Sequence, residues 1–211
     1  MKYFMLFMCV GVLLLPTINV QAKDYTFTPG NNGLGSLDHY YYYSWGIDWS
    51  VPSGEEIVDA YLTIDNINDW TQESNDKLYM HLLDNPSKGV SSWYDNQGHG
   101  DNWADKNRNA LGLTGTLVAT YTDENSYTEN LVYQFGSLGL LNDLCGVADT
   151  KPGNHKANFG FGFDPDCHYY NSGVKLTIKT TAAAVPEPSG LLVIFSCLSS
   201  VAGAMKLRRK S

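Results

Sequence analysis

The stretch Gly173–Thr180 alternates apolar and polar side chains along its whole length. Val174, Leu176 and Ile178 are the apolar residues, and a lysine or threonine stands between each pair. A period of two residues is that of a β-strand with one buried and one solvated face. Such a strand must pack its apolar face against a second layer, so a chain built of these strands folds as a sandwich or a barrel.

Six further strand-like runs precede this one and are separated by turn residues. They are His39–Trp49, Glu56–Asp65, Lys77–Asp84, Gly115–Thr122, Asn130–Phe135 and Asn158–Phe163. The only helix expected is a short one around Leu138–Leu144, and Tyr25–Gly35 reads as a loose lead-in. The expected fold class is therefore all-β, with a single jelly-roll-like β-sandwich domain.

Residues 1–22 have the pattern of a secretory signal peptide. Met1 and Lys2 provide a charged start, Tyr3–Leu15 is almost wholly apolar, and Val20–Ala22 forms a small-x-small cleavage site. We expect signal peptidase to cut after Ala22. An uncleaved membrane anchor is the alternative, although the apolar run is short for a membrane span.

The last 27 residues combine three features in a fixed order. A Pro-Glu-Pro motif comes first, an apolar stretch at 190–205 follows, and a basic cluster ends the chain. The residues of the motif and the cluster are Val185, Pro186, Glu187, Pro188, Lys206, Arg208, Arg209 and Lys210. The apolar stretch has the composition of a transmembrane helix, and the basic residues favour the cytoplasmic side.

This tail resembles the PEP-CTERM sorting signal of Gram-negative bacteria. The resemblance covers residues 185–211 alone, and it implies a membrane-embedded exosortase that cuts near the Pro-Glu-Pro motif. It also implies association with exopolysaccharide or biofilm matrix. A plain stop-transfer anchor is the alternative, and it explains the helix and the charges but not the motif. We expect a membrane-anchored precursor that ends in the cell envelope or extracellular matrix.

Between these ends, residues 23–184 are long enough for one extracytoplasmic domain with a sizeable core. This body holds nine basic and 21 acidic side chains, which gives a formal charge of −12. A body with this negative charge is repelled by nucleic acid and by anionic lipid. Neither is therefore an expected partner. Extracellular polysaccharide remains as a candidate partner.

Two of the four cysteines, Cys145 and Cys167, lie in the body. An exported protein folds in an oxidising compartment, so we expect a Cys145–Cys167 disulfide. Two buried thiols are the alternative.

Oxygen-bearing side chains are concentrated in the long stretch Asn85–Gly112 and in the turn after the sixth run. The candidate metal ligands are Asp101, Asp105, Asn107, Asn109, Asp164 and Asp166. The spacing of Asp105, Asn107 and Asn109 matches the first half of an EF-hand loop, and the rest of that motif is missing. Ca²⁺ is therefore a candidate cofactor. The alternatives are a polar loop built of Asx turns and a simple turn around Asp164.

Aromatic side chains are numerous in the body, and Trp93 and Trp103 lie in its long polar stretch. Exposed aromatic rings stack on sugars, so these two residues are the candidate carbohydrate-binding residues. Most other aromatic side chains are expected in the core. The chain contains neither an H-E-x-x-H nor a G-x-S-x-G motif, so no catalytic residue is assigned. We expect a non-catalytic carbohydrate-binding or structural module, with a secreted glycoside hydrolase-like enzyme as the alternative.

Overall fold

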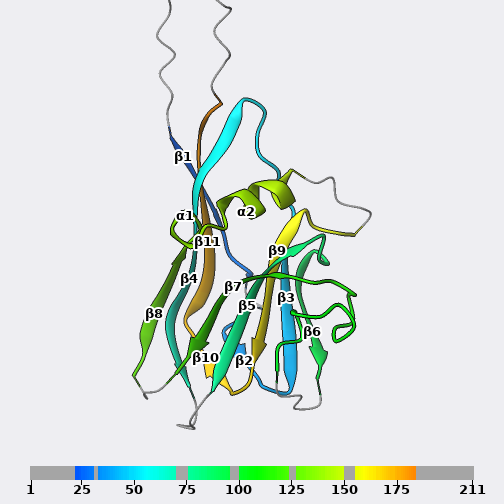
Figure 1. The fold of residues 1–211 in the computed structure, drawn as a ribbon. Helices are drawn as coiled ribbons and strands as arrows, with labels where there is room; N and C mark the ends of the chain where they lie inside the picture. Colours follow the sequence, from blue (N-terminus) through cyan, green and yellow to red (C-terminus); the bar gives the residue numbers. More distant parts are fainter. Residues whose placement is uncertain are drawn as a thin grey trace, which may run out of the picture.

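The computed structural model describes residues 22–30, 33–69, 76–95, 100–123, 127–149 and 155–183. Two antiparallel sheets lie face to face in a sandwich-like arrangement, and two short helices lie at one edge (Figure 1). The all-β fold class expected from the alternating runs is thus confirmed. Residues 1–21 of the expected signal peptide and the whole expected sorting tail at 185–211 fall outside the described residues.

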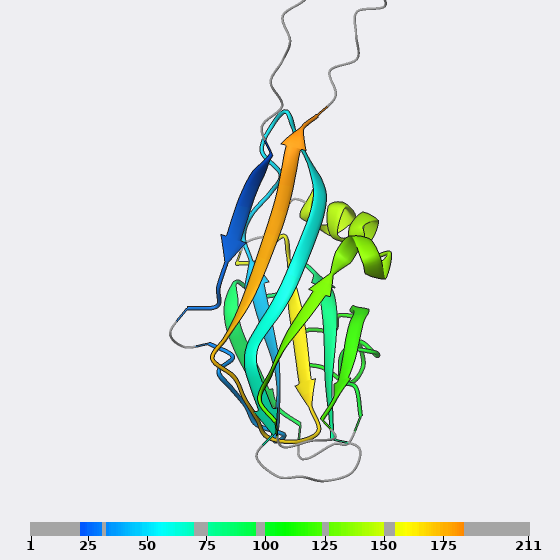
Figure 2. The ribbon, with the colours of Figure 1, turned by 90° about the vertical axis from the view of Figure 1, so that its left-hand side faces the viewer.

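The six-stranded sheet has the order β1-β11-β4-β10-β2, and β8 pairs with the free side of β4. Its long strands β1, β11, β4 and β8 lie side by side in Figure 2. The bounds are β1 Lys23–Phe27, β2 Ser36–Leu37, β4 Glu55–Asp69, β8 Glu129–Gln134, β10 Tyr169–Tyr170 and β11 Gly173–Ala182.

The five-stranded sheet has the order β6-β3-β9-β5-β7. Its strands are β3 Tyr41–Ile47, β5 Lys77–Asp84, β6 Gly89–Tyr94, β7 Thr116–Thr122 and β9 Phe159–Pro165. All pairings between named strands are antiparallel. The central strand β9 explains how this sheet is covered on both faces. Phe159, Phe161 and Phe163 are buried in the main core, whereas Gly160 and Gly162 alternate with them and leave room on the outer face.

The helices are α1 (Phe135–Leu138) and α2 (Leu141–Ala148). A single short helix was expected near Leu138–Leu144, and the structure has two, with a break between Leu138 and Leu141. Leu144 and Ala148 of α2 are buried in the core between the sheets. Since α2 contacts β4 of one sheet and β5 and β9 of the other, it closes the interior at that edge. No helix among the described residues is long and apolar enough to cross a membrane.

The short strands β2 and β10 were not expected, and three other elements also differ from expectation. The segment expected as a loose lead-in, Tyr25–Gly35, begins within β1, which pairs with β11 in the register Lys23↔Thr180. The long polar stretch contains β6, which pairs with β3 although Ser91 and Ser92 carry no apolar pattern. The third difference is the length of β4, which continues past Asp65 to Asp69. In each case backbone pairing with a neighbouring strand supplies order that the side-chain pattern alone does not indicate.

A β-bulge at Asn66 makes the extension of β4 possible. Its φ of 52° lies in the left-handed region, and the register with β8 shifts between Ile64 and Ile67. The extra residue changes which side chains face inward. Ile64 is buried before the bulge and Ile67 after it, so Asp69 follows in the inward phase.

The chain enters and leaves the sandwich on the same side of the molecule. Lys23, at the start of β1, pairs with Thr180 near the end of β11. This end is opposite to the end where β2 and β10 lie (Figure 1). The two short strands and the loops beside them therefore form the face farthest from the chain ends.

Candidate functional site

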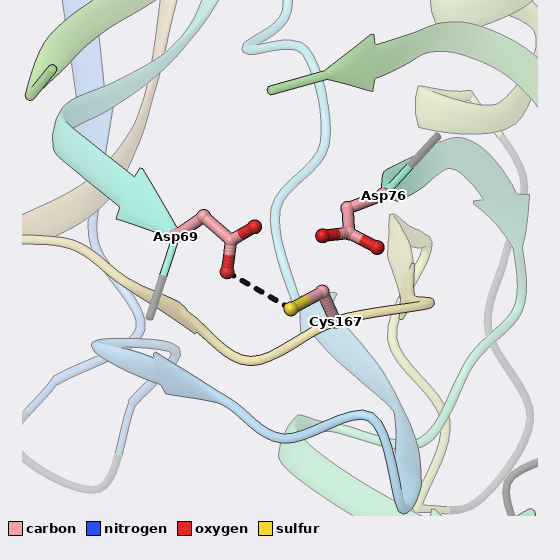
Figure 3. Close-up of side chains that lie close together, drawn as sticks. All are labelled: Asp69, Asp76 and Cys167. Carbon is pink, nitrogen blue, oxygen red and sulfur yellow. Dashed lines mark hydrogen bonds between the residues drawn. The ribbon is translucent and has the colours of Figure 1, made fainter. Parts of the chain in front are cut away.

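Three chemically reactive side chains meet inside the sandwich at the end where β2 and β10 lie. Asp69 ends β4, Asp76 immediately precedes β5, and Cys167 lies in the short connection between β9 and β10. One ligand atom of each lies within 4.8 Å of the other two, and Asp76 and Cys167 are buried (Figure 3). The Cys167 thiol donates a hydrogen bond to Asp69 Oδ1 at 2.9 Å. We call these three residues the acid–thiol cluster.

Strand periodicity brings these residues together. Each lies two positions from a buried core residue on its own segment, namely Ile67, Leu78 and Tyr169. Successive side chains of a strand point to opposite faces, so each member of the cluster points inward with its core neighbour. Asp123 has the same relation to the buried Tyr121, and its Oδ2 accepts the Asp69 backbone N–H at 3.2 Å. Acidic side chains thus lie at the ends of the inward-facing rows of β4, β5 and β7.

Two tyrosines border the acid–thiol cluster. The rings of Tyr121 and Tyr169 lie 5.9 Å apart, edge to face. Burial, together with the charges of Asp69 and Asp76, raises the pKa of Tyr169 far above its usual value. Burial and a hydrogen bond to Glu129 likewise raise the pKa of Tyr121. Both phenols therefore stay neutral hydrogen-bond donors.

The expected Cys145–Cys167 disulfide is wrong for this structure, in which both residues are thiols. Cys145 lies on α2, at the edge of the sandwich nearer the chain ends, whereas Cys167 lies in the cluster near β10 (Figures 1 and 3). A disulfide requires Cα atoms within about 7 Å. Counting cysteines in an exported body predicted the bond, but the fold directs the two side chains to different regions.

The assignment of Trp103 as an exposed carbohydrate ligand is also wrong, because its side chain is 0% exposed. The segment after β6 folds back over the outer face of the five-stranded sheet and places the indole against Gly162. A Cβ atom at Gly162 would lie 2.7 Å from ring atoms of Trp103. Tyr42 and Leu83 complete this second, smaller core, and Trp93 packs against it half-buried.

The same segment covers Asp164, which ends the outward row of β9. Asn102 donates its backbone N–H to Asp164 Oδ2, and only 1% of Asp164 is exposed. Burial is the main cause that raises the Asp164 pKa to about 7, and the charges of Asp95 and Asp101 act in the same direction. Beside it, Asp101 Oδ2 lies 2.7 Å from Nε2 of the buried His81.

The predicted calcium ligands divide into two groups. Asp101, Asp164 and Asp166 are brought together, since Gly100 N–H donates to Asp166 Oδ1 and Asn102 N–H to Asp164. By contrast, Asp105 accepts hydrogen bonds from the backbone and side chain of Asn107. The Asn109 amide donates to the carbonyls of Asn102, Asp105 and Leu113. The oxygens and amides of this second group hold the loop in shape.

The sequence made Ca²⁺ a candidate cofactor, and a thermal melt tests whether a specific calcium site exists. Because the loop side chains are engaged in Asx-turn hydrogen bonds, we expect calcium and magnesium at matched ionic strength to raise the melting temperature equally, by screening the acidic surface. If calcium raised the melting temperature more than magnesium did, and if Asp105→Ala abolished this difference, the ion would be placed in the loop. A larger shift that only Asp166→Ala abolishes would place the ion beside β9.

Exposed aromatic rings gather elsewhere, at the start of β3 and the end of β6. Tyr40 and Tyr94 are stacked with ring centroids 6.2 Å apart, and Tyr41 meets Tyr94 edge-on at 5.8 Å. His39 lies 4.5 Å from Tyr40. The exposed fractions are 37% for Tyr40, 38% for Tyr41 and 59% for Tyr94. We call these four residues the tyrosine cluster.

The sequence alone predicted neither cluster, although each has a recognisable pattern. Asp76 and Cys167 lie just before β5 and β10, each two residues before a buried residue of that strand, where a polar residue is unusual. Tyr40 and Tyr41 lie in an aromatic run that was assigned mainly to the core, and Tyr94 ends a strand that was not expected. Only the pairing Tyr41↔Tyr94 brings these rings together.

Comparisons with protein-family models, with curated proteins and with solved structures found no match.

Proposed function

We propose that this chain is an exported protein of the cell envelope or extracellular matrix whose jelly-roll-like sandwich binds carbohydrate without catalysing a reaction. The tyrosine cluster carries the proposal. Two of its rings are parallel and a third is edge-on, and all three are partly exposed. Tyrosine offers an apolar face to the CH groups of a sugar ring and a hydroxyl that stays hydrated, which suits a binding surface.

Polar groups beside the rings support this proposal. Asp38 Oδ1 accepts the Tyr40 backbone N–H at 3.0 Å, and Asp95 N–H donates to the Tyr40 carbonyl at 3.0 Å. These bonds fix the backbone on both sides of the stacked rings. Carboxylates so placed are acceptors for sugar hydroxyls, and a body with a charge of −12 favours neutral or amino sugars over acidic ones.

The arrangement of the chain ends supports the cellular part of the proposal. The described body enters and leaves at one end of the sandwich, whereas the strand ends that carry the tyrosine cluster lie at the other (Figure 1). Residues 185–211 resemble a sorting signal. We therefore propose that signal peptidase removes residues 1–22 and that an exosortase then processes the tail. A precursor anchored through its tail would present the cluster away from the membrane.

The alternative, a polysaccharide-active enzyme, has one observation in its favour. Asp164, with its pKa of about 7, has the acidity of a general acid. However, its carboxyl is buried under Asn102, and a general acid must reach the oxygen that it protonates. The burial of Asp164 therefore argues against a general-acid role for this residue.

A glycan array tests the proposal, followed by affinity measurements on the polysaccharide that binds best. We expect Tyr94→Ala to weaken binding at least tenfold, or about 1.4 kcal/mol, because it removes the most exposed ring of the cluster. Tyr127→Ala is the matched control, since Tyr127 is 78% exposed and lies outside the cluster, before β8. Equal affinities of both variants and the wild type would remove the tyrosine cluster from the site. Release of reducing sugar would favour the enzyme.

A further inference from the structure

The acid–thiol cluster has the dimensions of a site for one metal ion. Ligand atoms from Asp69, Asp76 and Cys167 lie within 4.8 Å of one another, and three separate chain segments contribute them (Figure 3). Oxygen and sulfur ligands about 2.0–2.3 Å from one tetrahedral zinc ion lie about 3.5 Å apart. The side chains therefore have to close by up to about 1 Å to hold the ion. This is the one such group of Asp, Glu, His or Cys side chains within the described ranges.

A second observation, independent of the cluster's own side chains, points to a ligand there. Tyr169 is fully buried, and its hydroxyl has no hydrogen-bond partner among the residues that the structure describes. Buried hydroxyls are almost always paired in native proteins. A ligand bound in the cluster would supply the partner.

The direction of Tyr169 follows from the sheet. It stands directly opposite Asp69 in the antiparallel pairing of β10 with β4, so both side chains leave the same face. Cys167 precedes it by two residues and shares that face.

We propose that Asp69, Asp76 and Cys167 bind one divalent transition-metal ion, with Zn²⁺ as the test ion, and that the Tyr169 hydroxyl is directed at its fourth ligand position. The thiol selects the metal class. Thiolate sulfur favours zinc and similar ions, whereas calcium and magnesium prefer sites made only of oxygen. The sequence offered no histidine or cysteine spacing for zinc, because these ligands lie on three segments that only the fold assembles.

Binding has a defined proton balance. In the metal-free site the Cys167 S–H donates to Asp69 Oδ1. The thiol proton leaves to solvent when Sγ bonds the metal, and Asp69 Oδ1 exchanges its hydrogen bond for a metal bond. The ion offsets the negative charge that two carboxylates and a thiolate bring into a largely buried site. Affinity therefore rises with pH as the proton is more easily released.

Cobalt substitution of the metal-free full chain tests the proposal, because Co²⁺ occupies zinc sites and is visible by absorption. We expect one equivalent of Co²⁺ to produce a sulfur-to-cobalt charge-transfer band in the near ultraviolet, and Zn²⁺ to displace it. Cys167→Ala should abolish the band. Cys145→Ala is the matched control and should retain it, since Cys145 lies on α2. Absence of the band in the wild type, its loss in Cys145→Ala or its survival in Cys167→Ala would overturn the proposal.

Thermal melting provides a second readout that needs no cysteine variant. Zn²⁺ should raise the melting temperature of the wild type by mass action, and calcium should raise it no more than magnesium does. Asp76→Asn keeps the side-chain volume and should lose the Zn²⁺ shift, whereas Asp105→Asn in the outer loop should keep it. A Zn²⁺ shift of the same size in Asp76→Asn would refute the site.

Discussion

Replacing Trp103 with alanine lowers the free energy of unfolding by about 3–5 kcal/mol, the usual cost of removing a buried indole. The side chain is fully buried and fills the space above Gly162, with Tyr42 and Leu83 around it. Its loss leaves a cavity under the loop that covers Asp164. Urea denaturation followed by circular dichroism measures the change.

Two variants make this experiment decisive. Trp103→Phe keeps an aromatic ring and removes an indole N–H that finds no acceptor among the described residues, so it should cost much less than Trp103→Ala. Tyr127→Ala removes an exposed ring and should change stability by less than about 0.5 kcal/mol. If Trp103→Ala changed stability as little as Tyr127→Ala does, Trp103 would be an exposed side chain, as the sequence analysis expected.

The second large effect is a pH dependence that belongs to Asp164. Its pKa is about 7 in the folded protein, compared with an ordinary value of 3.8. Between these two pH values the folded state binds more protons than the unfolded state, so this group's contribution to stability falls as the pH rises. At about 1.36 kcal/mol for each pH unit, about 4 kcal/mol is present below pH 4 and lost by pH 7.

The variant Asp164→Asn isolates this effect, because an amide keeps an acceptor for the Asn102 N–H and does not titrate in this range. We expect its free energy of unfolding, measured relative to the wild type, to rise by about 4 kcal/mol between pH 4 and pH 7.5. Asp105→Asn, at an exposed position, should show a nearly constant difference. A constant difference for Asp164→Asn as well would mean that Asp164 is ionised throughout and that the loop does not bury it.

The strands themselves were predictable because their signal is local. Val174, Leu176 and Ile178 alternate with polar residues, and the structure buries all three in the core. The same period placed β5 at Lys77–Asp84 and β7 within Gly115–Thr122. A period of two is a property of one strand, and it needs no knowledge of the strand's neighbours.

The candidate sites were not predictable in this way, because each depends on contacts between distant segments. Trp103 is buried since β9 presents Gly162 beneath it, and the sequence does not show that these residues meet. The acid–thiol cluster needs the bulge at Asn66, which turns Asp69 inward, and the pairing of β10 with β4, which brings Cys167 beside it. Sequence determined which residues alternate. Strand order and register, set by packing of the whole chain, decided which side chains face one another.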